Sequence, residues 1–102
     1  MRRLAARIDR VGTLAVDMLD ALRDRSIPRG AAVSIELSMA RVTDRLIHAS
    51  DAAAVLDIVD MGRMLGTLLE FLPPRAADAL RAWDRELALL WREAVSELGS
   101  PW

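Results

Sequence analysis

The chain has 102 residues, of which 53% are apolar and 28% charged, and 14 arginines against 15 acidic residues give a formal net charge of −1. This composition excludes intrinsic disorder and predicts one folded domain over residues 1–102, because the apolar fraction is high enough to build a core. The absence of cysteine excludes disulfides and thiolate metal sites.

Both the N-terminal segment and the longest apolar segment carry too many charges for a targeting or membrane-spanning sequence. In residues 1–10, charged residues interrupt the apolar ones, so the apolar run of a signal peptide is missing. Residues 52–72 contain four charged side chains that a membrane span would carry into hydrocarbon: Asp57, Asp60, Arg63 and Glu70. We therefore expect a cytoplasmic protein without membrane contact.

Residues 3–25 show the spacing of an amphipathic helix. Apolar residues recur every three or four positions along one stripe, which consists of Leu4, Ile8, Val11, Ala15, Met18 and Leu22. The opposite face holds Asp9, Thr13, Asp17, Asp20 and Asp24. This helix is expected to bury one side only.

The next helix is predicted from a start between residues 28 and 31 to about residue 49, since Pro28 suits a first helical turn and Ser26 can cap it. A third helix, capped by Ser50 or Asp51, would continue to residue 72. Apolar residues at heptad spacing begin at Ile35 and continue past Ser50 without a break. The alternative is therefore that the second and third helices form one long bent helix.

Pro73 and Pro74 end the third helix, because proline lacks the N–H of a continuing helix. A fourth helix begins near Pro74 and ends at Gly99. Its stripe consists of Ala76, Leu80, Trp83, Leu87, Leu90, Ala94 and Leu98. Since no stretch alternates with period two, the sequence predicts an all-α fold, an antiparallel bundle of about four helices.

The second and third helices carry more apolar side chains than one buried stripe can use. A bundle of this size covers only about two-thirds of its chain's surface, and exposed apolar patches of several hundred Å² are rare in monomers. We therefore predict a dimer, most simply a two-fold one. Its interface would use Val33, Leu37, Ala40, Ile47, Met61, Met64, Leu68 and Phe71. The alternative is a monomer whose second helix sits centrally, or whose long combined second and third helix is wrapped by its neighbours.

Gly62 and Gly66 lie on one face of the third predicted helix. Because an interior glycine costs about 1 kcal/mol relative to alanine, we expect it to be offset by a tight helix crossing or to mark a kink.

The usual residues of enzymatic chemistry are scarce in this chain. It has one histidine and no tyrosine, its serines lack a nucleophile elbow, and its five glycines form no phosphate loop. Three sets of acidic residues, one of which includes the histidine, have the spacing of metal ligands along a helix, but none is part of a Glu-x-x-His motif. They are Asp17 with Asp20, Asp57 with Asp60, and Asp44 with His48 and Asp51. We expect solvated charges there, no metal and no cofactor.

One polar strip of the second helix holds Arg41, Arg45 and His48, with Ser34 and Ser38 in line at spacings of three and four. This strip is a candidate anion-binding site. The segment from Arg41 to His48 also resembles the Arg-x(4–6)-His motif of HEPN domains, all-helical bundles that often dimerise so that two motifs meet. That resemblance implies metal-independent RNA cleavage by Arg41 and His48, as in toxin or defence RNases; Val42 stands where the family usually has a polar residue.

Binding of nucleic acid through charge alone is not expected, because arginine and aspartate alternate without forming a basic face. Trp83 and Trp91 are predicted core residues, and Trp102 is a candidate docking anchor. We expect a non-enzymatic, homo-oligomeric interaction module, a regulatory or scaffolding subunit of a larger bacterial-type assembly that binds itself and another protein. The HEPN-like RNase is the alternative.

Overall fold

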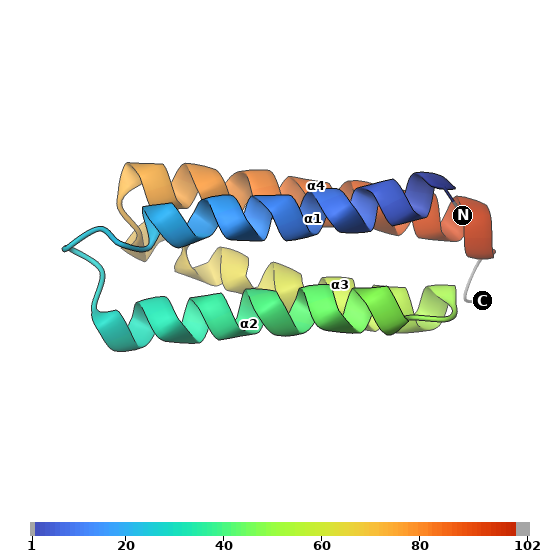
Figure 1. Ribbon diagram of the computed structural model, residues 1–102, viewed down its shortest axis with the longest axis horizontal. Coiled ribbons are helices and arrows are strands. Elements are labelled where there is room, and N and C mark those ends of the chain that lie inside the picture. Colours follow the sequence, from blue (N-terminus) through green and yellow to red (C-terminus); the bar gives the residue numbers. More distant parts are fainter. Residues whose placement is uncertain (1, 100–102) are drawn as a thin grey trace.

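The computed structural model describes residues 2–99 as four long helices and one short 3-10 helix. The elements are α1 (Arg2–Ala21), α2 (Arg29–His48), α3 (Ala52–Arg63), η1 (Met64–Phe71) and α4 (Pro74–Leu98). Figure 1 shows the helices along the long axis of a 43 × 22 × 19 Å molecule, with α1 and α4 in one layer and α2 and α3 in the other. No strand occurs in residues 2–99, so the predicted all-α fold of four packed helices is confirmed.

The core forms where apolar stripes of the four helices meet. On α1, the stripe is buried or half-buried from Leu4 to Leu22, whereas the five polar residues of the opposite face are exposed. On α2, the buried residues are Ile35, Met39, Val42 and Leu46. On α4, the stripe is buried except for the half-buried Leu98. These stripes were predicted correctly because burial on an amphipathic helix follows the 3.6-residue period.

The turn between α1 and α2 begins earlier than predicted. Helix α1 ends at Ala21 instead of Arg25, because from Arg23 on the N–H groups donate across three residues, as in Arg23 N to Asp20 O. The carboxylate of Asp24 then accepts hydrogen bonds from both the N–H and the hydroxyl of Ser26. Ser26 therefore stabilises this turn and does not cap α2, so its predicted capping role is wrong.

Two separate helices, α2 and α3, replace the single bent helix considered as the alternative. The backbone becomes extended at Ala49 and Asp51, and the Asp51 carboxylate accepts a 2.8 Å hydrogen bond from the N–H of Ala54. Of the two predicted caps, the structure uses Asp51. A carboxylate at this position satisfies a free N–H group of the first turn and so favours a new helix.

The predicted third α-helix changes geometry part-way. From Met64 to Phe71 the chain forms a 3-10 helix, so the expectation of α-helix up to residue 72 is wrong. Side chains three apart eclipse each other in this geometry, and Met64, Thr67 and Glu70 are accordingly all exposed. Leu72 is extended, as expected for a residue that precedes proline.

The two glycines of the third predicted helix have different surroundings. A Cβ atom built at Gly62 would lie 2.7 Å from Leu87 Cδ1, so α3 and α4 pack closely there. At Gly66, no atom lies within 4 Å of the built Cβ. The predicted tight crossing is therefore present at Gly62 and absent at Gly66.

Candidate functional site

The polar strip of α2 lies on the surface, with Arg41, Arg45 and His48 all exposed. Arg45 Nη1 lies 3.8 Å from Met61 Sδ, and neither arginine forms an ion pair with any residue in 2–99. The strip thus presents two unpaired guanidinium groups one helical turn apart. Their ability to hold an anion remains a prediction.

The imidazole of His48 is fixed by its own helix. Its Nδ1 lies 2.9 Å from the backbone carbonyl oxygen of Asp44 and 3.9 Å from the carboxylate of that residue. A carbonyl oxygen only accepts hydrogen bonds, so Nδ1 carries the proton and Nε2 of the neutral ring has a free lone pair. A single copy of the chain therefore presents one exposed Arg41–His48 pair, while Val42 is buried in the core.

Most of the eight predicted interface residues are exposed. The exposed fraction is 42% for Val33, 62% for Leu37, 63% for Ile47, 71% for Met64 and 75% for Phe71. Ala40 is also exposed, whereas Met61 and Leu68 are half-buried. Leu37, Met64 and Phe71 are therefore not covered by the fold of a single copy.

These eight residues do not form one surface. Ala40 and Ile47 border a groove between α2 and α1, and Val33 borders a hollow beside the α1–α2 turn. Residues Met61, Met64 and Leu68 border a different groove on the other side of α2, together with Arg41 and Ser38. Arg41 and Ser38 of the polar strip therefore belong to the second groove and lie on a different side of α2 from Ala40 and Ile47.

The groove between α1 and α2 has a volume of about 360 Å³ and a floor of small residues. Gly12 and Ala15 contribute from α1, and Ala40 contributes from α2. The rim on α1 is Val16, which is 63% exposed and was not among the predicted interface residues. The sequence could have predicted this exposure, because Val16 lies outside the apolar stripe of the first predicted helix, on its polar side.

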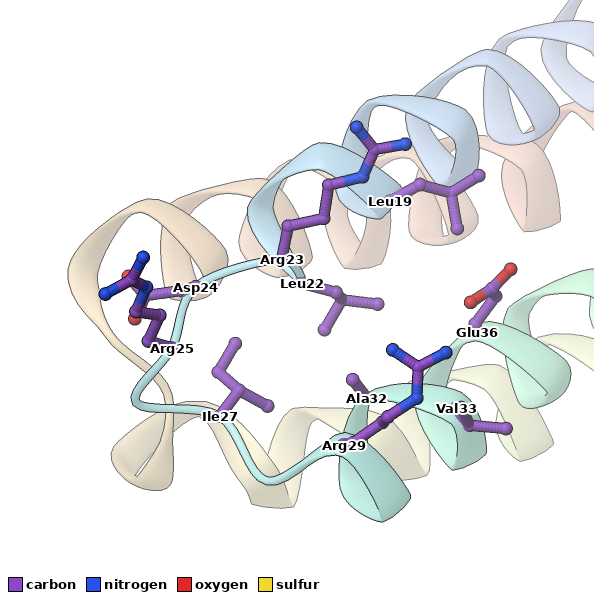
Figure 2. A pocket seen from close by; sticks show the side chains of 10 residues that line it. All are labelled: Leu19, Leu22, Arg23, Asp24, Arg25, Ile27, Arg29, Ala32, Val33 and Glu36. Atoms are coloured by element: carbon purple, nitrogen blue, oxygen red, sulfur yellow. The ribbon is translucent and has the colours of Figure 1, made fainter.

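A second hollow, of about 440 Å³, lies at the α1–α2 turn (Figure 2). Ile27 and Leu22 lie in its apolar part, and Arg23, Arg25 and Arg29 surround it. Leu19 and Glu36 border both this hollow and the groove, so the two are continuous along the α1–α2 seam. The arginines also give one end of the seam a positive charge.

The acidic side chain at the turn has an altered pKa. Hydrogen bonds from the hydroxyl and then the N–H of Ser26 lower the pKa of Asp24 below its usual range, because both stabilise the charged carboxylate. Asp24 therefore stays ionised beside the three arginines, and it offsets part of their charge.

The remaining predicted candidates lie apart from these grooves. Asp17, Asp20, Asp57 and Asp60 are exposed. No cluster of three or more His, Cys, Asp or Glu side chains suited to a metal occurs within the described part of the chain. Trp83 is buried and Trp91 half-buried. Trp102 lies outside the described residues.

Comparisons with protein-family models, with curated proteins and with solved structures gave no match to this chain. Within residues 2–99, no helix is both long enough and apolar enough to cross a membrane.

Proposed function

We propose that this chain is a non-enzymatic protein–protein interaction module. It would be an antiparallel helical bundle that associates with copies of itself in the cytoplasm, as a regulatory or scaffolding subunit of a larger bacterial-type assembly. The observation that supports this proposal is the exposure of five large apolar side chains, each more than three-fifths exposed, on a bundle with an otherwise closed core: Val16, Leu37, Ile47, Met64 and Phe71.

The free energies of burial and of association indicate that a complex must bury several of these side chains together. Complete burial of one such side chain contributes about 1.5–3 kcal/mol, so the exposed part of each contributes roughly 1–2 kcal/mol. Association costs about 4–15 kcal/mol in lost freedom of motion. A single exposed residue therefore changes little, whereas a surface that covers three or more gives a measurable complex.

Sedimentation velocity across a concentration series tests this proposal. The wild-type chain is expected to sediment as an oligomer, and double substitution of Leu37 and Ile47 by Ser to shift it toward the monomer. Asp57→Ser, an exposed polar change on α3, is the control and should have no effect. A chain that stays monomeric up to about 1 mM and binds no other protein would contradict the proposal.

A second candidate function is the HEPN-like, metal-independent RNase that uses Arg41 and His48. It is favoured by one observation: both side chains are exposed on the same helix, and the hydrogen bond from Nδ1 to Asp44 leaves His48 Nε2 free to accept a proton. Incubation with RNA in the presence of a chelator tests it. Cleavage that both His48→Ala and Arg41→Ala abolish would support the RNase, and cleavage that survives either substitution would exclude it.

A further inference from the structure

A groove of about 350 Å³ lies between α2 and η1, and it is here called the α2–η1 groove. Helix α3 follows α2 after a short turn and packs against it, but α3 has 12 residues and α2 has 20. At 1.5 Å per residue, about 12 Å of α2 therefore extends beyond the end of α3. The chain continues as η1, which packs against α4 and α3 and rises toward the start of α4 in Figure 1 (yellow). On this side, α2 thus has less helix beside it than a longer α3 would supply.

The two walls of the α2–η1 groove differ in chemistry. The wall on α3 and η1 is largely apolar and consists of Met61, Met64, Leu65 and Leu68, with Thr67 at its edge. Methionine side chains are unbranched and flexible, so they adapt to different partners, and Met64 is 71% exposed. The wall on α2 presents Ser38 and Arg41 beside the buried Val42. A ligand would therefore meet apolar side chains on one flank and positive charge on the other.

Two guanidinium groups on the α2 side have no carboxylate partner within residues 2–99. Arg41 borders the groove, and Arg45 contacts the groove residue Met61, with Nη1 3.8 Å from Sδ. Neither arginine forms an ion pair in the part of the chain that the structure describes. They stand four residues apart, about 6 Å along the helix. No acidic side chain borders this groove, whereas Glu36 borders both hollows on the α1 side of α2.

The carboxylates closest in the sequence leave this positive charge available. Asp44 precedes Arg45, but it borders the groove toward α1, and its carboxylate lies 3.9 Å from Nδ1 of His48. Asp60 and Glu70 flank the apolar wall in the sequence. Both are exposed, and neither borders the α2–η1 groove. The two guanidinium groups can therefore pair with carboxylates that come from another molecule.

We infer that the α2–η1 groove binds an acidic amphipathic α-helix of another protein. This inference rests on the proposed function and names the class of its protein partner. The apolar face of that helix would cover Met64 and its neighbours, as in helix-in-groove recognition with anchors at i, i+3 or i+4 and i+7. Two carboxylates four residues apart on its flank would match the spacing of Arg41 and Arg45. The eight residues of η1 are about 16 Å long, so about 11 residues of the partner helix cover them.

A second copy of this chain does not offer that pattern. Within residues 2–99, the large apolar side chains that are exposed lie on α1, α2 and η1, and η1 is itself a wall of the groove. On α1 there is a single one, Val16. On α2 the exposed carboxylates are Glu36 and Asp44, which stand eight residues apart, twice the spacing of the two arginines. Charge complementarity therefore favours a helix from a different protein.

Selection from a displayed peptide library tests the groove. The library presents helices of about four turns with leucine fixed at i, i+3 and i+7 and with Asp, Glu, Lys, Arg or Ser at each flanking position. The wild-type chain is expected to enrich peptides that carry two acidic residues four apart on one flank. Fluorescence anisotropy should give such a peptide a Kd of about 1–100 μM, because the groove is short. Its affinity should fall in high salt.

Variants of the groove walls then show where the selected peptide binds. Arg41→Glu should weaken binding about tenfold, and exchange of the facing peptide carboxylate for lysine should restore it. Arg10→Glu makes the same charge change on an exposed residue of α1 and is the matched control, with no expected effect. Met64→Ser should also weaken binding about tenfold, whereas Met64→Leu keeps the apolar contact and should change it less than about threefold. Circular dichroism checks that each variant is folded.

Three results would overturn the groove as a docking site. The first is a selection that enriches no peptide, and the second is one that enriches peptides without an acidic pair. The third is a selected peptide whose binding survives both Arg41→Glu and Met64→Ser. Self-association measured by sedimentation velocity would leave the proposed function standing in each case.

Cysteine trapping tests whether a second copy occupies the groove instead, since the chain contains no cysteine of its own. Met64→Cys is expected to stay monomeric under mild oxidation, because the groove is reserved for a different protein. A covalent dimer that excess peptide does not suppress would overturn the inference and support the self-association in the proposed function. If no peptide binds and sedimentation shows only monomer, both the groove and the self-association fail.

Discussion

Replacement of Gly62 by Ala tests the close packing of α3 against α4. The added Cβ would lie 2.7 Å from Leu87 Cδ1 and 3.0 Å from Trp83 Cη2 on α4. Both residues are fully buried, so neither side chain can move without displacing others. On the α2 side, Val42 Cγ2 lies at 3.4 Å and leaves little room to shift. We expect the helices to separate slightly and the free energy of unfolding to fall.

The size of the loss follows from two opposing contributions. Overpacking of a close-packed core costs about 1–3 kcal/mol. Alanine also stabilises the helix relative to glycine by about 1 kcal/mol. Since the 2.7 Å contact with Leu87 places Gly62 at the upper end of the first range, we expect a net loss of about 1–2 kcal/mol. A loss of 1 kcal/mol lowers the Tm of a domain this size by roughly 4–8 °C.

Urea denaturation followed by circular dichroism measures this loss, with Gly66→Ala as the matched control. At Gly66 no atom lies within 4 Å of the built Cβ, so alanine should leave the stability unchanged or raise it by up to about 1 kcal/mol. If Gly62→Ala unfolds at the same urea concentration as the wild type, or above it, the close packing of α3 against α4 is refuted.

Three further changes test local interactions. Asp51→Ala removes the side chain that accepts from the first turn of α3 and should lower the free energy of unfolding by about 1 kcal/mol in urea denaturation. Arg7→Leu breaks the 2.9 Å ion pair that joins α1 to the buried Glu86 of α4. The loss is expected to be about 1–3 kcal/mol, and adding Glu86→Leu should recover part of it, as a double-mutant cycle would show. Ser26→Ala removes the hydroxyl that stabilises ionised Asp24, so an NMR titration should show the pKa of that carboxyl rising toward its usual range. Because the pKa of Asp24 is lowered in the folded state, its contribution to stability is present above the usual aspartate range and is lost as the pH falls through the lowered value.

Helix boundaries were predictable where a single proline or glycine determines the backbone conformation. Pro74 occupies the first turn of α4 and Gly99 ends it with a φ of 88°, both as predicted from the sequence. The end of α1 was not predictable, since apolar spacing continues to Leu22, whereas backbone hydrogen bonds across three residues and the bonds that Ser26 donates to the Asp24 carboxylate turn the chain. The 3-10 segment from Met64 to Phe71 was also missed, because apolar residues are frequent enough there to fit either helical period.

The candidate interface was predictable in its residues but not in its arrangement. Helical period identified Ile47 and Met64 as residues outside the buried stripes, and both are exposed. They border two different grooves, and this separation depends on which helix packs on each side of α2, which is a tertiary property. Val16 shows the same limit, because it gains its place beside Ala40 only when α1 packs next to α2.

The two proposed functions use different sides of the same helix, α2. Successive residues on a helix are rotated by 100°, so Ala40 and Ile47 border the groove with α1, while Ser38 and Arg41 border the groove with η1. Association through the α1–α2 groove would leave both Arg41–His48 pairs outside the interface. In the HEPN domains that the motif resembles, dimerisation often brings two such motifs together, which here would need the opposite side of α2. The face on which two copies associate therefore bears directly on the chemistry: a covalent dimer that forms under mild oxidation through Val16→Cys but not through Arg41→Cys would count against the RNase before any RNA is added.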